Sequence, residues 1–145
     1  MELKKEMILL NQQFDNKEDA IRASGRLLVE NGCVESEYIE SMIERNEMVS
    51  VYMGNFIAIP HGTDESKKYV KKSGISILQV PQGVQFGEDD TEDVAMIIFG
   101  IAGVGDEHLD ILQKIAIFCS NIENVIKLAD AKSSEEIIKY LEEVE

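Results

Sequence analysis

The chain has 145 residues, of which 44% are hydrophobic and 29% are charged, a balance typical of a soluble globular domain with a buried core. Acidic side chains number 28 and basic side chains 14, which gives a formal net charge of −14 at pH 7. Such a chain is repelled by nucleic-acid phosphates and by an anionic membrane surface, so both are excluded as partners. We expect residues 1–145 to form one domain that meets a basic face of another protein.

The sequence contains no pattern of a membrane span or a secretory leader. The longest uncharged apolar stretch, residues 94–105, is much shorter than the roughly 20 residues that cross a bilayer. The apolar block near the amino end, residues 7–10, is shorter than the ~7 to 15 residues of a secretory hydrophobic region. We therefore expect a cytoplasmic protein with no direct membrane insertion.

Two helices are predicted in the first third of the chain. Residues 15–32 carry apolar side chains at helical spacing, and Asp15 with Glu18 suggests a capping box at the start. Residues 36–46 repeat the same spacing in a shorter helix, with Arg45 in its last turn.

Apolar runs of a different kind follow these helices. Residues 56–59, 74–80 and 94–99 are short, continuous and bounded by Gly, Pro or charge, which is typical of strands buried on both faces. Pro81 is expected to end the second of these strands. Between the second and third runs we expect an exposed turn region with a short edge strand at residues 84–86.

Helical periodicity returns after residue 105 and again after residue 133. The first apolar stripe consists of Leu109, Leu112, Ile115, Ala116 and Cys119. The second helix starts at a capping box of Ser133 and Glu136, and its stripe consists of Ile137, Leu141 and Val144. Together the segments predict an α/β fold, a three-layer sandwich in which helices flank a small mixed sheet of about five strands.

Two cysteines, Cys33 and Cys119, lie far apart and are not part of a Cys-x-x-Cys motif. This spacing indicates neither a disulfide framework nor a thiolate zinc site. Both are expected to be small core residues.

The stretch GNFIAIPHGT, residues 54–63, presents one of the two histidines, His61, directly after a predicted buried strand. Open α/β sheets usually place their working groups at such strand ends. Pro60 restrains the backbone, and Gly62 has no Cβ beside the ring, so the imidazole could be held firmly and still be reached. Neutral imidazole can attack phosphorus or bind a metal. The alternative is a loop histidine without a role.

The second histidine, His108, lies in the stretch GVGDEHLDILQ, in the first turn of a helix whose expected N-cap is Asp106. The positive end of a helix dipole favours an anion and a neutral imidazole there. Asp106 and Glu107 add negative charge, so they would have to point away from a bound anion. Ordinary packing of His108 at a helix start is the alternative.

Both histidines follow apolar strands, so they could meet at one edge of the sheet, where the guanidinium of Arg45 could hold phosphate oxygens. Pairing of Arg45 with the carboxyl end of its own helix explains it equally well. A metal site completed by Asp64 or Asp110 is a weaker hypothesis, because two histidines alone lack the usual zinc ligand spacing. Nucleotide-binding glycine loops and metalloprotease motifs are absent, so no cofactor and no metal are expected.

Two segments, ERNEMVSVYMGNFIAIPHGT at residues 44–63 and GDEHLDILQKIA at residues 105–116, resemble a known family. It is the EIIA component of the phosphoenolpyruvate-dependent sugar phosphotransferase system, in the mannitol/fructose class, and the likeness spans nearly the whole chain. The resemblance implies a phosphotransferase that relays phosphate. The histidine matching His61 would take a phosphoryl group from the phosphocarrier HPr and pass it to a cysteine of the EIIB or EIICB permease component, with mannitol as the expected sugar.

The resemblance also implies that the histidine matching His108 stabilises the phosphohistidine and that the arginine matching Arg45 assists with phosphoryl charge. Two departures concern the arginine: Asn46 stands where the family often has Glu, and Val51 stands where a Thr commonly precedes the Tyr-x-Gly. Either change could alter the orientation of Arg45.

A relay site has to be shallow, because two partners must reach the same imidazole. Met48, Met53 and Phe56 are possible contacts around it, with core packing as the alternative for each. A different function within the same family is a regulatory EIIA-like module, nitrogen-related or attached to a regulator, that is not coupled to sugar transport.

Overall fold

The computed structural model describes residues 3–88 and 92–142, except for the side chain of His108. Five strands form one sheet in the order β1-β4-β5-β3-β2. The strands are β1 (Ile8–Leu9), β2 (Tyr52–Gly54), β3 (Ile57–Ala58), β4 (Gly74–Gln85) and β5 (Val94–Ala102). β1 and β3 run parallel to their long neighbours, whereas the pairs β4/β5 and β2/β3 are antiparallel, so the sheet is mixed as predicted.

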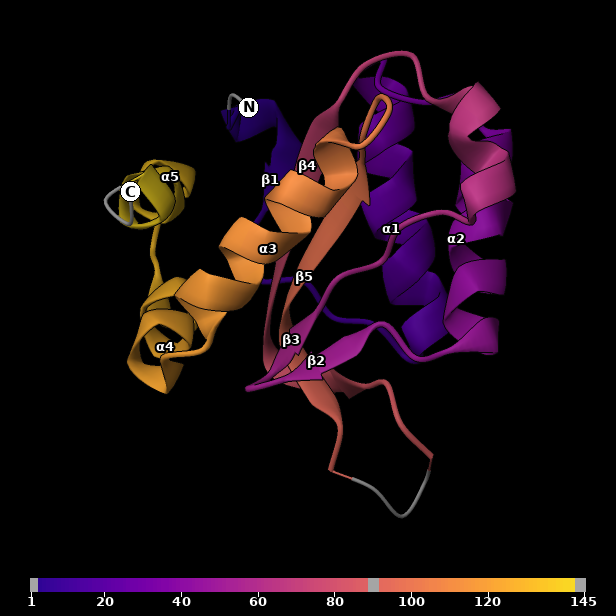
Figure 1. Ribbon diagram of the computed structural model, residues 1–145. Helices are drawn as coiled ribbons and strands as arrows, with labels where there is room; N and C mark the ends of the chain where they lie inside the picture. Colours follow the sequence, from indigo (N-terminus) through magenta and orange to yellow (C-terminus); the bar gives the residue numbers. More distant parts are fainter. Residues whose placement is uncertain (1–2, 89–91, 143–145) are drawn as a thin grey trace.

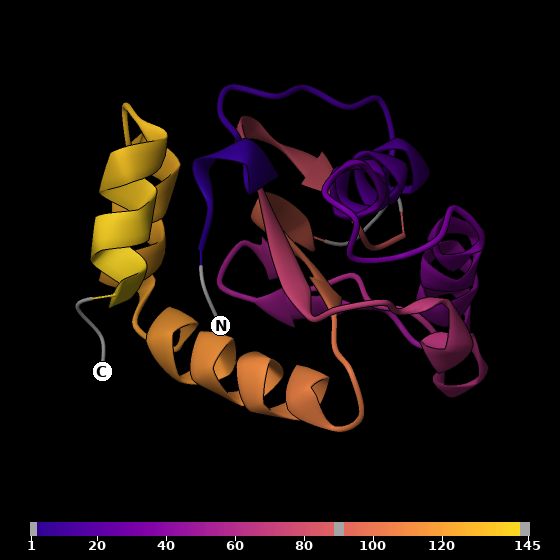
Figure 2. The same ribbon diagram turned by 90° about the horizontal axis from the view of Figure 1, so that it is seen from above.

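Helices cover both faces of the sheet (Figures 1 and 2). One face carries α1 (Lys17–Glu30) and α2 (Glu37–Met48), and the other carries α3 (Glu107–Cys119), α4 (Ile122–Asp130) and α5 (Ser134–Glu142). β5 shows why two cores form: Ile98 packs in one hydrophobic cluster, while Ile97 and Phe99 pack in the other. Alternate side chains of a strand point to opposite faces, so a continuous apolar run serves both cores. The predicted three-layer α/β sandwich is confirmed.

The strand β4 is longer than the sequence predicts. Pro81 does not end it, and the expected edge strand at residues 84–86 is largely its continuation, paired with β5. The register against β5 shifts between Gln79 and Val84, which is where Pro81 lies. A proline lacks the N–H that a regular ladder needs, and an irregularity in the pairing accommodates it.

The start of α1 also differs from the prediction. The N-cap is Asn16, whose side-chain Oδ1 accepts the N–H of Asp19 at 2.9 Å. The proposed capping box of Asp15 and Glu18 is therefore wrong by one residue. The strands β1 and β2 and the helix α4 have no counterpart among the predicted elements.

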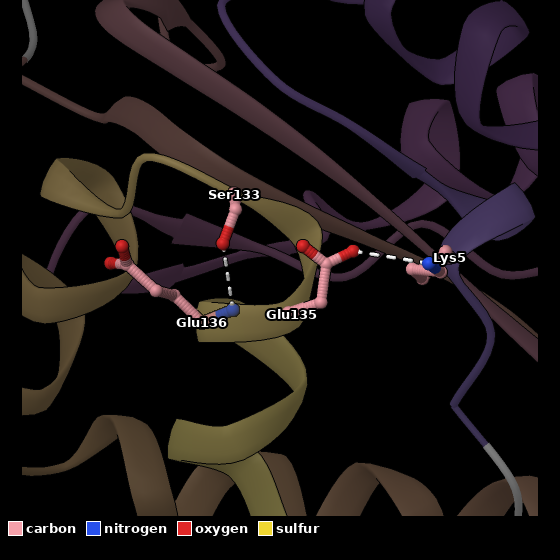
Figure 3. Close-up of polar contacts among 4 residues, drawn as sticks. All are labelled: Lys5, Ser133, Glu135 and Glu136. Atoms are coloured by element: carbon pink, nitrogen blue, oxygen red, sulfur yellow. Dashed lines mark hydrogen bonds and ion pairs between the residues drawn. The ribbon is translucent and has the colours of Figure 1, made fainter.

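The start of α5 agrees with its predicted cap in part. Ser133 Oγ accepts the N–H of Glu136 at 3.1 Å, but the Glu136 carboxylate accepts from the N–H of Lys132 instead of completing the box. Beside it, Glu135 pairs with Lys5 at 3.3 Å, which links α5 to the 3-10 turn Lys5–Met7 (Figure 3). That pair is exposed, so it adds little stability.

The apolar stripe predicted for the last helix packs against the core where the structure describes it. Ile137 is fully buried and Leu141 packs against the same core, as expected, whereas Val144 lies outside the described residues.

Within the ranges that the structure covers, no helix has the length and apolar character needed to cross a bilayer.

Cys33 and Cys119 are buried free cysteines, one in each core, which confirms the expectation for both. Burial raises the pKa of Cys119 to about 12. Burial also raises the pKa of Cys33, with Lys72 and Lys4 opposing the shift. Both thiols therefore stay protonated, and unreactive as nucleophiles, near neutral pH.

Gln79 of β4 connects the sheet to the end of α4. Its side chain is 1% exposed, and its Nε2 donates to the carbonyls of Leu128 at 2.9 Å, Ala129 at 3.1 Å and Ala131 at 2.9 Å. Its Oε1 accepts the N–H of Asn11 at 3.1 Å. One buried amide thus provides hydrogen-bond partners for the last carbonyls of α4 and for the backbone N–H of Asn11 in the loop after β1.

We predict that Gln79→Leu lowers the free energy of unfolding by about 2 to 4 kcal/mol, because these backbone groups lose their partner inside the protein. Urea unfolding followed by circular dichroism measures the change. The matched control is Gln13→Leu, an exposed glutamine that donates to Gln82, where a change below about 0.5 kcal/mol is expected. Equal losses of unfolding free energy in the two variants would contradict a stabilising role for the hydrogen bonds of Gln79.

Candidate functional site

A cleft of about 440 Å³ opens where β3 and β5 end. Its walls come from α2, from the loop after β3, from the 3-10 turn Asp64–Tyr69 and from the first two turns of α3. Each wall contributes a distinct side chain: Arg45, His61, Lys67 and Leu109. A second hollow of about 510 Å³, beside the turn between β2 and β3, has Glu92 as the one charged side chain among its described lining residues.

The position of His61 follows from the pairing of β3 with β5. The two strands are parallel, and a further bridge pairs His61 with Ile101 after β3 itself has ended. The N–H of Ile101 donates to the carbonyl of Pro60 at 2.9 Å. Pro60 supplies only a carbonyl to this contact, so its missing N–H costs nothing. His61 is therefore held at the point where the chain leaves the sheet.

The ring of His61 is half-buried, and its Nδ1 lies 2.9 Å from the carbonyl oxygen of Ile59. A carbonyl oxygen can only accept a hydrogen bond, so Nδ1 carries the proton in this contact. The neutral ring then has its lone pair on Nε2. The sequence did not indicate which ring nitrogen could act as a nucleophile, and this hydrogen bond identifies Nε2.

Gly62 has a different role from the one inferred from the sequence. A Cβ at this position would meet Ser66 Oγ, lie 2.5 Å from Tyr38 Cε1 and lie 2.8 Å from Ser41 Oγ. The space beside Gly62 is therefore filled by α2 and by the turn Asp64–Tyr69, and it is not left open for a visiting molecule. Glycine is needed because two elements pack directly on the backbone next to His61.

Arg45 makes the contact with its own helix that the sequence offered as one alternative, and it also reaches the cleft where the other alternative would place it. Its Nη1 donates to the carbonyl of Val49 at 2.7 Å, at the carboxyl end of its own helix, and the side chain also lines the cleft. The two residues that depart from the family pattern contact each other: the N–H of Val51, in the loop after α2, donates to the buried Oδ1 of Asn46, in the last turn of α2, at 3.0 Å. Neither residue contacts Arg45 in these bonds. Their hydrogen bond instead closes the loop that contains Val49, whose carbonyl accepts from Arg45.

His108 is the second residue of α3, whose N-cap is Asp106 as predicted, and its side chain lies outside the described part of the structure. Since β3 and β5 are parallel neighbours, the loops that follow them leave the same edge of the sheet, so the backbones of both histidines come to one edge. The Glu107 carboxylate accepts the hydroxyl of Ser73, whose oxygen accepts the N–H of Val104 at 2.9 Å. Glu107 is thus directed toward the start of β4.

The apolar residues near the cleft are more exposed than core packing allows. Met48 lines the cleft and is 67% exposed, so packing in the core is wrong for it. Met53 and Phe56 are also exposed, but Phe56 borders the second hollow and not the cleft of His61. Leu109, which the sequence assigned to a buried stripe, is 56% exposed at the cleft wall.

Carboxylates were considered as metal ligands beside the histidines. Asp64 lines the cleft, and Asp110 is exposed on α3. Among the side chains that the structure describes, no group of three or more His, Cys, Asp or Glu could hold a metal ion.

The fold and the cleft together define a class of protein: a three-layer α/β protein with a tautomer-fixed histidine at a strand end, two basic side chains in the cleft wall and an apolar rim. Residues 1–144 match the family model of the phosphoenolpyruvate-dependent sugar phosphotransferase system, EIIA 2. The chain belongs to that family, and the resemblance noted in the sequence is confirmed.

Individual relatives agree with this family. The mannitol-specific phosphotransferase enzyme IIA component of Enterococcus faecalis is 63% identical over 134 residues, which are 92% of each chain. The crystal structure of IIA mannitol from Escherichia coli has a TM-score of 0.91 at 36% identity, covering 97% of this chain and 99% of that one. The complex of enzyme IIA-mannitol and phosphorylated enzyme IIB-mannitol from Escherichia coli has a TM-score of 0.92 at 35% identity, with 98% of each chain covered.

We predict that Gly62→Ala lowers the free energy of unfolding by about 1 to 3 kcal/mol, because the new methyl group overlaps atoms of two packed elements. It should also weaken the hydrogen bond from His61 Nδ1 to Ile59, which the ring resonances of His61 in an NMR spectrum would show. Thr63→Ala is the control, since the described structure gives that side chain no hydrogen bond. A fully stable Gly62→Ala protein with an unchanged His61 ring would contradict the packing argument.

Proposed function

We propose that this chain is the phosphoryl carrier of a mannitol phosphotransferase system. His61 accepts a phosphoryl group from the phosphohistidine of HPr and passes it to a cysteine of EIIB or EIICB. The observation that carries the proposal is His61 itself, a histidine with its proton held on Nδ1 at the mouth of a cleft, in a chain of the EIIA 2 family. In support, the similar Enterococcus faecalis protein is named mannitol-specific, and the similar Escherichia coli protein was solved with phosphorylated enzyme IIB.

The chemistry is a pair of in-line displacements at phosphorus. In the first, the lone pair of His61 Nε2 forms a bond to phosphorus, and the donor imidazole leaves with the electron pair of its own N–P bond. In the second, the EIIB cysteine attacks as a thiolate, forms an S–P bond and releases His61 as neutral imidazole. Both steps need positioning and charge stabilisation more than proton transfer. A relay between protein side chains requires no cofactor of its own.

The positive charge of the site is proposed to come from three sources in addition to Lys67 of the cleft wall. Arg45, placed by its bond to Val49, supplies a guanidinium at the cleft wall. The start of α3 supplies the positive end of a helix dipole, where His108 would stabilise the phosphorylated ring. The Nδ1–H of His61, held by Ile59, stabilises the cationic ring that forms while the N–P bond is present.

The proposal extends to the partners and to the whole chain. Met48 and Leu109 form an exposed apolar rim that suits brief docking of HPr and of EIIB at one site. The net charge of −14 favours fast encounter with a basic face. Because the family model spans residues 1–144, we propose the full chain as one relay domain, acting in the cytoplasm.

We predict that the protein takes up an acid-labile phosphate on His61 when it is incubated with phosphoenolpyruvate, enzyme I and HPr. Folded His61→Ala should take up none, because the attacking nitrogen is absent. Peptide mapping of the labelled protein locates the phosphate, and circular dichroism checks that the variant is folded. Continued labelling of His61→Ala would end the assignment of His61 as acceptor.

A second prediction separates transport from regulation. In a mixture reconstituted with enzyme I, HPr and a mannitol permease, this chain should support phosphorylation of mannitol, and the rate should be lower with a fructose permease. Phosphorylation of the sugar itself is the measurement. If His61 is labelled but no sugar is phosphorylated by either permease, the regulatory EIIA-like alternative is favoured instead.

A further inference from the structure

A buried tyrosine in the cleft wall has no part in the relay chemistry described above. Tyr38 of α2 is 4% exposed, and its hydroxyl makes two hydrogen bonds to backbone groups of different elements. It accepts the N–H of Gly62 at 2.9 Å and donates to the carbonyl of Ile101 at 2.8 Å. Burial raises the pKa of Tyr38, so the hydroxyl keeps the proton that it donates.

The hydroxyl lies within the pairing that holds His61. When residue 61 pairs in parallel with residue 101, a regular ladder bonds Ile101 N–H to Pro60 and Gly62 N–H to Ile101. The first of these bonds is direct, at 2.9 Å. At the second, the hydroxyl of Tyr38 bonds both partners, accepting from the N–H of Gly62 and donating to the carbonyl of Ile101. His61 therefore lies between a direct rung and a rung whose two ends are both bonded to the Tyr38 hydroxyl.

Neighbouring residues pack closely around the tyrosine. The hydroxyl of Ser41 donates to the carbonyl of Tyr38 at 2.6 Å, and the missing Cβ of Gly62 allows the ring edge to approach the loop. Tyr38 and Arg45 are seven residues apart on α2, which puts them on one face of the helix two turns apart, and both line the cleft. The same helix face thus carries the guanidinium of the site and the hydroxyl that bonds the histidine loop.

We propose that Tyr38 is a positioning residue for phosphoryl transfer, whose hydroxyl sets the separation of the His61 loop from the end of β5. This inference rests on the proposed function, because it concerns the direction in which His61 presents Nε2 to phosphorus. Without the hydroxyl, the N–H of Gly62 and the carbonyl of Ile101 either lose a partner or close on each other. Both outcomes move the backbone of His61, and a displacement of about 1 Å can slow such a reaction by up to about 100-fold.

The test is the single-turnover rate at which phospho-HPr phosphorylates Tyr38→Phe at a temperature where the variant is folded. We expect a rate at least about tenfold below that of the unaltered protein. Tyr52→Phe is the matched control: its hydroxyl also accepts a backbone N–H, from Phe56 at 3.2 Å, but at the turn between β2 and β3, outside the cleft. Its rate should stay within about twofold.

A second readout separates positioning from general stability. ¹⁵N NMR of the His61 ring should show the Nδ1–H tautomer in the unaltered protein and in Tyr52→Phe, and a mixture of tautomers in Tyr38→Phe. If Tyr38→Phe does not fold, 3-fluorotyrosine placed at position 38 keeps the hydroxyl while strengthening it as a donor. It should change the transfer rate and the ring shifts of His61, while the same substitution at Tyr52 should change neither.

The results distinguish failure of the positioning role of Tyr38 from failure of the relay through His61. An unaltered rate and tautomer in Tyr38→Phe, or in the fluorotyrosine protein where Phe does not fold, overturns the role of Tyr38. Equal slowing of the Tyr38 and Tyr52 variants also overturns it, because the effect would then follow stability alone. His61→Ala in the same assay reports on the proposed function: if it still accepts phosphate, the relay through His61 fails whatever Tyr38 does.

Discussion

The parallel pairing of β3 with β5 brings together the parts of the site that lie far apart in the sequence. It sets His61 beside Ile101 and sends the loops after both strands out of the same sheet edge, so α3 begins next to the histidine cleft. Both strands are buried between two hydrophobic cores, and a slip of one residue would exchange their inward and outward side chains. The stability of the sandwich therefore maintains the geometry of the cleft.

Polar groups in and around this pairing adjust it where a regular ladder would continue. Pro60 contributes a carbonyl without an N–H, Gly62 has no Cβ and so allows α2 to pack on the backbone, and the Tyr38 hydroxyl bonds both Gly62 and Ile101. The imidazole is in turn held by the carbonyl of Ile59. Each bond satisfies a backbone group that burial would otherwise leave without a partner, so the loop gains rigidity without extra secondary structure.

Charge acts at two ranges around the cleft. The net charge of −14 acts as a partner approaches, within roughly the 10 Å over which salt screens exposed charges. The described cleft lining has two basic side chains, Arg45 and Lys67, against one acidic side chain, Asp64, and Ser73 holds the Glu107 carboxylate toward the start of β4. An acidic protein can thus present a local environment that suits an anionic group. The negative net charge and the basic cleft are compatible, because the attraction of Arg45 and Lys67 for an anion outweighs the repulsion by the acidic surface only at contact distance.

Local pattern determined the sandwich architecture, the strand ending before His61 and the helix starting before His108, because periodicity and turn residues act over a few neighbours. The prediction that Pro81 ends a strand is wrong, because pairing with β5, which is distant in sequence, allows β4 to continue past the proline. The short strands β1 and β2 carry too few residues for a periodic signal. The tautomer of His61 and the bridging role of Tyr38 were decided only by tertiary structure. Both depend on carbonyls and N–H groups whose relative positions exist only once the chain has folded.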